Sequence, residues 1–167
     1  MKESNSVTYV MPDSCTMQKI AANPNYLQAL KSRFDFSNSE IITCDTVDYE
    51  LTKYQISVDD ISVQFFKVLG VNVVSVDSTT DEYVLAEHLI QRNSSMLHWP
   101  DNLILASAMK HNAVLLSCDR KLLHVSTIEG HRSMNTDLVG TNQFNLAQNQ
   151  LPEIREPKID QKWSVAI

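Results

Sequence analysis

The segment Val7-Thr8-Tyr9-Val10-Met11-Pro12-Asp13 decides the fold class. Its first five residues are β-branched, aromatic or apolar, a composition typical of a buried strand, and Pro12 with Asp13 closes it. A strand that is covered on both faces has a continuous apolar run of this kind. The segment therefore predicts a buried first strand, with a carboxylate directly behind its end.

The chain that follows alternates strand-like and helix-like segments. Further strands are expected at Glu40–Cys44, Val71–Val76 and Ala113–Ser117. Apolar residues at helical spacing predict helices at Tyr26–Phe34, Thr46–Tyr54, Val58–Leu69 and Asp101–Lys110. A further helix is expected from the capping-box pair Thr79 and Glu82 to about Arg92. Strands that alternate with helices imply an α/β fold with a parallel central sheet flanked by helices.

The pattern weakens beyond Asp119. The segment Lys121–Ile128 is apolar enough to pack, and Gly130–Gly140 is polar enough to hold only a short strand. The segment Thr141–Ile167 is rich in Asn and Gln, then contains two prolines, and ends near Trp163, which predicts a helix followed by an extended arm. We therefore divide the chain into a domain of residues 1–140 and an arm of residues 141–167. The arm either folds back onto its own domain or docks on a partner or a second subunit.

Composition restricts the classes of function. The chain has 167 residues, of which 43% are apolar, enough for one substantial core. The formal net charge of −6 gives no sign of a broad basic surface for non-specific nucleic-acid binding, and only three glycines are present, so no Walker or dinucleotide loop can be written. No stretch resembles a signal peptide or a membrane span, and a cytoplasmic location is expected.

Cysteine and histidine offer no zinc or disulfide pattern. Cys15, Cys44 and Cys118 are odd in number, far apart in the sequence and flanked by apolar residues. They are interpreted as free buried thiols in a reducing compartment. The five histidines show no ligand spacing.

Four acidic residues, in contrast, stand in apolar surroundings. Asp13 and Asp119 follow the ends of predicted strands, while Glu50 and Asp101 lie on the apolar faces of predicted helices. A carboxylate in such surroundings is unfavourable unless it is paired, hydrogen-bonded or bound to a cation. The four acids, as we call these residues below, therefore suggest a shared metal.

Helical phase selects the two acids on helices. Val47, Leu51 and Tyr54 fall at positions i, i+4 and i+7. Glu50 takes position i+3 on the same face and is expected to point inward, whereas Asp48 is expected to face water.

Asp101 begins a buried stripe that continues through Ile104, Leu105 and Ala108. Backbone N–H groups favour an anion at that end of a helix, so a purely structural carboxylate is the alternative interpretation. Asp77 also follows a strand, but no second feature connects it with the four acids, and we interpret it as a solvated loop acid.

The order and spacing of four segments resembles the PIN-domain ribonucleases, including the small toxins of type II toxin–antitoxin pairs. The segments are Met11-Pro12-Asp13-Ser14, Val47-Asp48-Tyr49-Glu50-Leu51, Pro100–Ala108 and Val114–Leu122. The resemblance implies a three-layer fold and an acidic site that binds Mg²⁺ or Mn²⁺ and hydrolyses phosphodiester bonds in single-stranded RNA. Matched motif by motif, that site is Asp13, Glu50, Asp101 and Asp119.

The resemblance also suggests roles and partners. Asp13 and Asp119 would be direct metal ligands, and Asp101 a direct or water-mediated ligand. Glu50 would orient or deprotonate the attacking water, with Ser14 and Ser117 as supporting hydrogen-bond donors. An antitoxin or another protein is an expected partner, and a homodimer is the expected assembly. The segment Arg120-Lys121-Leu122 departs from the many members that have a further acid or an aromatic there, and the arm lies outside the resemblance.

Two other classes of function remain open from the sequence. An inactive PIN-like scaffold that binds a protein partner is suggested by the acidic net charge and the terminal arm. A receiver or phosphatase-like domain would form an acylphosphate on Asp13. That class calls for closely paired acids after the first strand, where only Asp13 is present.

Overall fold

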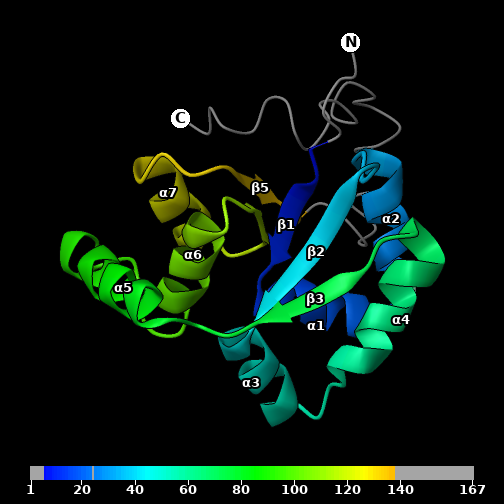
Figure 1. The fold of residues 1–167 in the computed structure, drawn as a ribbon, viewed down its shortest axis with the longest axis horizontal. Helices are drawn as coiled ribbons and strands as arrows, with labels where there is room; N and C mark the ends of the chain where they lie inside the picture. The colour runs from blue at the N-terminus through cyan, green and yellow to red at the C-terminus, as the bar shows by residue number, and fades with distance from the viewer. Residues whose placement is uncertain (1–5, 24, 138–167) are drawn as a thin grey trace.

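The computed structural model describes residues 6–23 and 25–137 of the chain. Within them, five strands form one parallel sheet in the order β3-β2-β1-β4-β5 (Figure 1). The strands are β1 (Thr8–Pro12), β2 (Ser39–Cys44), β3 (Val73–Val76), β4 (Val114–Ser117) and β5 (Ser133–Asn135). The helices are α1 (Ser14–Ala22), α2 (Tyr26–Arg33), α3 (Asp45–Lys53), α4 (Val58–Leu69), α5 (Thr80–Arg92), α6 (Asp101–Lys110) and α7 (Arg120–Ile128).

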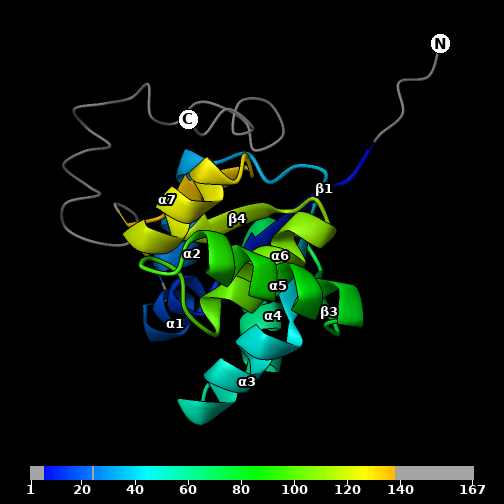
Figure 2. The ribbon, with the colours of Figure 1, turned by 90° about the vertical axis from the view of Figure 1, so that its left-hand side faces the viewer.

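Helices cover both faces of the sheet, so the predicted three-layer α/β arrangement is confirmed. Helices α1, α2 and α4 pack against one another on one face, and α6 and α7 pack on the other, with α5 against α6 (Figures 1 and 2). The carboxyl-terminal half of β1 and the whole of β4 are covered: Val10 and Met11 of β1 and Leu115 and Leu116 of β4 have no exposed surface. A continuous apolar run in the sequence thus corresponds to a strand buried on both faces.

The register of the sheet sets the position of the functional residues. Pro12, the last residue of β1, lies opposite Leu116 of β4. The Asp13 N–H extends this pairing by donating to the Leu116 carbonyl at 2.9 Å. Because the strands are parallel, the segments that leave β1, β2 and β4 all emerge at the same edge of the sheet.

Two local features differ from the sequence predictions. Helix α1 was not predicted; it begins at Ser14, and Asp13 is its N-cap, accepting a hydrogen bond from the Thr16 N–H at 3.0 Å. Helix α5 begins where the capping-box pair predicts, but the box itself does not form. The Thr79 hydroxyl instead donates to the Glu82 carboxylate at 3.4 Å and caps no backbone N–H.

The predicted arm of residues 141–167 and the boundary at residue 140 lie outside the described residues. The short strand expected within Gly130–Gly140 is confirmed as β5. In the part of the chain that the structure describes, no helix combines the length and apolar character needed to span a membrane.

Gly70 provides a test of the backbone at the end of α4. It caps the helix in the left-handed region, with φ of 68°, and an added Cβ would meet no atom within 4 Å. Gly70→Ala should therefore destabilise the protein by about 1 kcal/mol through backbone strain alone. Gly70→Asn should recover part of that loss, because Asn tolerates this conformation. Chemical denaturation measures both, and an Ala variant as stable as the parent would contradict the prediction.

Candidate functional site

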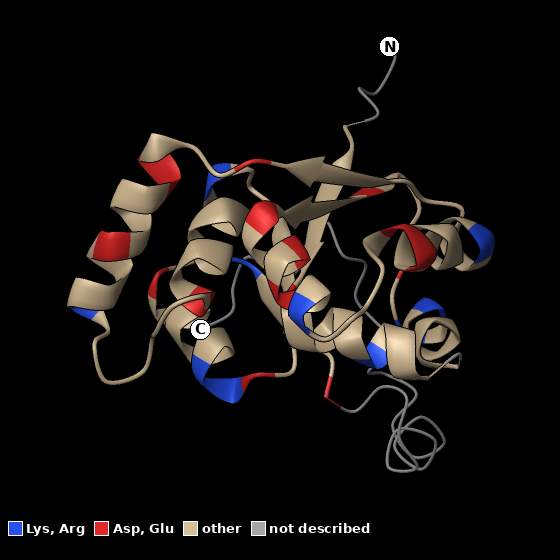
Figure 3. Ribbon diagram, turned by 90° about the horizontal axis from the view of Figure 1, so that it is seen from below, with Lys and Arg blue, Asp and Glu red and all other residues tan. Residues whose placement is uncertain are grey.

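The four acids predicted from the sequence lie on segments that meet at the carboxyl edge of the sheet. Asp13 follows β1 and Asp119 follows β4. Glu50 lies on α3, the helix that leaves β2, and Asp101 is the first residue of α6. Figure 3 looks onto this edge, and acidic positions lie on the elements around its centre.

Asp13 is held in one position by two neighbouring elements. It is only 3% exposed. Besides the Thr16 N–H of α1, its carboxylate accepts a hydrogen bond from the Ser117 hydroxyl of β4 at 2.5 Å. Burial raises the pKa of Asp13, and these donors oppose the rise. The carboxylate is therefore fixed relative to both strands at the centre of the sheet.

Ser117 connects Asp13 with Asp119. Its hydroxyl donates to Asp13 and accepts from the Asp119 N–H at 2.9 Å, and its side chain is fully buried. The Asp119 carboxylate caps α7 by accepting from the N–H groups of Lys121 and Leu122 at 2.9 and 3.3 Å. A single hydroxyl thus bridges the two aspartates that the parallel register brings side by side.

Glu50 is attached to α1 through Ser14. The Ser14 hydroxyl donates a hydrogen bond to the Glu50 carboxylate, and Glu50 is half-buried. The helical phase that selected Glu50 therefore placed it on the correct side of α3. Ser14 and Ser117, both predicted as supporting donors, each donate to one of the four acids.

The prediction that Asp48 faces water is wrong. Asp48 is half-buried and accepts hydrogen bonds from the hydroxyls of Thr43 and Ser75. Burial, opposed by these two donors, raises its pKa. Helical phase took account of only one helix, whereas Thr43 and Ser75 belong to the adjacent strands β2 and β3. Asp77, in contrast, is exposed, as predicted.

Asp101 carries the strongest indication that the four acids act on one another. Its pKa is raised to about 7, first by burial. The next contributions, in order, come from the negative charges of Asp119, Asp13 and Glu50. A hydrogen bond with the Asp119 carboxyl raises the pKa further. Like charges shift a pKa in this way only at short range, so the four carboxyls share one electrostatic environment.

The chemistry of these groups fits a hard divalent cation. Mg²⁺ and Mn²⁺ prefer oxygen ligands, and carboxyls that repel one another gain from a cation between them. Within residues 6–23 and 25–137, however, no three His, Cys, Asp or Glu side chains are arranged to hold a metal ion. Three of the acids, Asp13, Glu50 and Asp119, accept hydrogen bonds from neighbouring donors, so a bound cation would share these carboxylates with the donors.

Two thiols flank the same acids, a feature that the sequence analysis missed. Cys15 contacts both carboxylate oxygens of Asp13, at 3.2 and 3.3 Å, and is hydrogen-bonded to Cys118. That bond is the largest cause that raises the pKa of Cys15 and lowers the pKa of Cys118. The signal was present, since each cysteine lies within two residues of a strand-end aspartate. Cys44 is buried, as expected, whereas Cys15 and Cys118 are only half-buried, so that part of the prediction is wrong.

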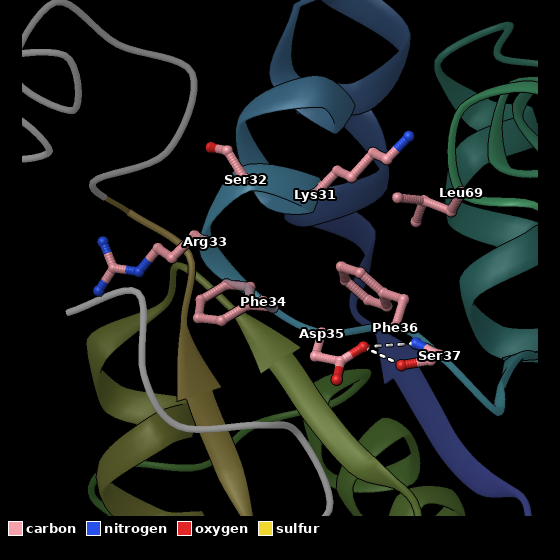
Figure 4. Close-up of a pocket in the computed structure, with 8 residues that line it drawn as sticks. All are labelled: Lys31, Ser32, Arg33, Phe34, Asp35, Phe36, Ser37 and Leu69. Atoms are coloured by element: carbon pink, nitrogen blue, oxygen red, sulfur yellow. Dashed lines mark hydrogen bonds between the residues drawn. The ribbon is translucent and has the colours of Figure 1, made fainter. Parts of the chain in front are cut away.

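A separate pocket of about 500 Å³ lies at the opposite, amino edge of the sheet, around the loop between α2 and β2 (Figure 4). Its lining includes Lys31, Asp35 and Phe36, and Asp35 accepts hydrogen bonds from the backbone and hydroxyl of Ser37. None of the four acids lines this pocket. The pocket and the four acids are therefore separate features at opposite edges of the sheet.

Comparison with solved structures identifies the fold. VapBC2 from Rickettsia felis, in a crystal structure with a DNA fragment from its promoter, matches with a TM-score of 0.52 at 14% identity. The match covers 71% of this chain and 93% of that one. The chain has a PIN-like fold.

Two further structures are similar at lower TM-scores. A PilT N-terminus domain protein from the archaeon Sulfolobus solfataricus has a TM-score of 0.48 at 11% identity, over 78% of this chain and 88% of that one. A protein from Pyrobaculum aerophilum has a TM-score of 0.42 at 21% identity, over 73% and 83%. Neither the models of protein families nor the curated proteins contain a match to the chain.

The raised pKa of Asp101 predicts a pH-dependent stability. The folded protein keeps the Asp101 proton up to about pH 7, whereas the unfolded chain releases it near the ordinary value of 3.8. The stability that this proton provides is therefore complete below pH 3.8, declines as the pH rises above that value, and is lost once the pH has passed about 7. Asp101→Asn should raise the melting temperature at pH 8 by about 3–8 °C and by a clearly smaller amount at pH 5.

Asp59→Asn is the matched control, because Asp59 is exposed in the first turn of α4. Its effect should be small and similar at both pH values. A loss of stability in Asp101→Asn at pH 8, or an equal effect at pH 5 and pH 8, would contradict the electrostatic interpretation. Thermal melts followed by circular dichroism decide between these results.

Proposed function

We propose that the chain is a metal-dependent endoribonuclease that hydrolyses phosphodiester bonds in single-stranded RNA. The observation that supports it best is the action of Asp119, Asp13 and Glu50 on the pKa of Asp101. Perturbed carboxyls gathered at the carboxyl edge of an α/β sheet are characteristic of functional sites. The PIN-like fold and the resemblance in sequence favour the same function.

The site has the properties that hydrolysis of an anionic substrate requires. A phosphodiester repels the four acids, so the carboxyls need a counterion before a strand can approach. Bound Mg²⁺ or Mn²⁺ would neutralise the charge that develops on the phosphoryl oxygens and favour ionisation of a water. Asp13 and Asp119 would hold the cation, since Ser117 fixes their relative position. Asp101 would join them once its proton has left.

Glu50 is the residue placed to handle the attacking water. It is half-buried, and its hydrogen bond from Ser14 leaves part of the carboxylate available to accept from a water. In the proposal, Glu50 orients that water and takes its proton. Ser14 fixes the direction of the carboxylate from the neighbouring helix α1. Removing Ser14 should therefore weaken hydrolysis without removing a metal ligand.

The proposal also covers the protein partner, the assembly and the location of the chain. VapBC2, whose structure has the similar fold, was crystallised with DNA from its promoter. Because the folds are similar, we also propose that this chain is the toxin of a toxin–antitoxin pair, with an antitoxin as its protein partner. A homodimer and a cytoplasmic location belong to the same proposal, the latter supported by three free thiols.

An inactive scaffold that binds a protein partner is the second candidate. It is favoured by one observation: in the described part of the chain, no three acidic, His or Cys side chains already form a metal site. In this case the hydrogen bonds of Asp13 and Asp119 would serve only to cap α1 and α7. The two candidates differ in whether the four acids respond to a metal.

Cleavage of single-stranded RNA tests the leading proposal. Asp13→Asn should lower the single-turnover rate with Mn²⁺ by roughly a hundredfold or more, because a lost ligand removes transition-state charge stabilisation. Asn remains a good N-cap, so α1 should persist. Asp77→Asn is the control, since Asp77 is an exposed acid just beyond β3. Full activity in Asp13→Asn would exclude the proposed site.

A thermal shift separates the two candidates without any assay of activity. Mn²⁺ or Mg²⁺ at saturating concentration should raise the melting temperature of the parent at pH 8 by several °C, on the order of 2–3 kcal/mol of stabilisation. The shift should shrink in Asp119→Asn, which removes one ligand but keeps a capping side chain. A parent that does not respond to either metal would favour the inactive scaffold.

A further inference from the structure

Two large aromatic side chains are exposed to solvent on the segments that carry Glu50 and Asp101. Tyr49 of α3 and Trp99, which precedes α6, are each 57% exposed. Their ring centroids are 6.5 Å apart, and the ring planes make an angle of 58°. The rings therefore contact each other across the junction of two elements while most of their surface stays accessible.

The position of this aromatic pair follows from its neighbours in the chain. Tyr49 directly precedes Glu50, and Trp99 lies two residues before Asp101. Consecutive Cα atoms are about 3.8 Å apart, so each ring is attached within a few ångströms of the backbone that carries a site acid. Since α3 and α6 contact each other, the pair lies where the two segments that carry Glu50 and Asp101 meet.

Packing of the core does not explain the pair. Aromatic residues that stabilise this core are almost fully covered, as Tyr26 and Phe65 are at 1% and 0% exposure. Tyr49 and Trp99 keep more than half of their surface in water, which is unfavourable for apolar rings and adds little to stability. Exposed aromatic faces next to a polar site are typical of ligand stacking.

A lysine beside Tyr49 fits a nucleic-acid strand as the ligand. Lys53 follows Tyr49 at i+4, which puts both on the same side of α3, and both are exposed. A cation next to an aromatic face suits a strand whose bases stack while its phosphates pass a basic group. The angle of 58° prevents one base from lying flat on both rings, so each ring would receive a different base.

We propose that Tyr49 and Trp99 form a stacking site for two unpaired bases of single-stranded RNA, next to the phosphodiester that reaches the acids. The site deepens the proposed function, on which it rests for the identity of the strand. It selects single strands because paired bases in a duplex do not offer their faces to a protein ring. It carries no sequence preference beyond stacking strength, since every base has a π-face.

Binding of a fluorescein-labelled single-stranded RNA to the full-length chain tests this site. The measurement uses the Asp101→Asn background, so that the strand stays intact and electrostatic repulsion is reduced. Tyr49→Leu and Trp99→Leu should each weaken binding about tenfold, the usual effect of losing one stacked base. Tyr49→Phe and Trp99→Phe should restore most of the affinity, because they keep a ring.

Two controls make the outcome specific to stacking. Tyr83→Leu removes a similarly exposed ring, 53% accessible, from α5 and should leave binding unchanged. An RNA of the same length with abasic positions should bind the parent weakly and show no difference between the parent and the Leu variants. Thermal melts confirm that each variant is folded before its affinity is compared.

The possible results separate this site from the proposed function. Unchanged binding in both Leu variants, or an equal loss with the abasic strand, overturns the stacking site whether or not the parent cleaves RNA. Binding that depends on both rings, in a parent that shows no metal-dependent cleavage, supports the stacking site and contradicts the nuclease. If the chain does not bind single-stranded RNA, the stacking site is overturned, and contact with another protein becomes the explanation of the exposed aromatic pair.

Discussion

The parallel pairing of β1 with β4 is the constraint on which the site depends. It sets Pro12 opposite Leu116, so both strands end at the same edge and Asp13 and Asp119 emerge together. The buried hydroxyl of Ser117 then connects the two aspartates by donating to one and accepting from the backbone of the other. A change in register of a single residue would separate them and turn the strand side chains to the wrong face.

The same arrangement opposes stability. Carboxyls that share a partly buried space repel one another, and the pKa of Asp101 records that repulsion. N-cap hydrogen bonds to Asp13 and Asp119 offset part of it, so each acid has a structural role besides any catalytic one. A cation bound between the carboxyls would remove the remaining repulsion. Unfavourable local electrostatics of this kind is common where a fold is built around a function.

The sequence predicted the elements with strong periodicity and the acids that depend on them. Helix α6 was bounded correctly because Pro100 interrupts the chain and an apolar stripe follows, and Glu50 was found from the phase of α3 alone. Helix α1 was missed because Asp13 was interpreted only as a ligand, although an aspartate at the end of a strand is also a helix-start signal.

Features that depend on tertiary contacts could not be predicted from the sequence alone. Asp48 was misplaced because its hydrogen-bond donors are on neighbouring strands. The contact of Tyr49 with Trp99 joins residues far apart in the chain, and only the folded arrangement of α3 and α6 brings them together. A crystal of the full-length chain soaked in Mn²⁺ would show directly whether the four acids bind a metal ion. An anomalous peak about 2 Å from carboxylate oxygens of Asp13 and Asp119 is predicted, and a soaked crystal without a peak at the four acids would contradict the metal site.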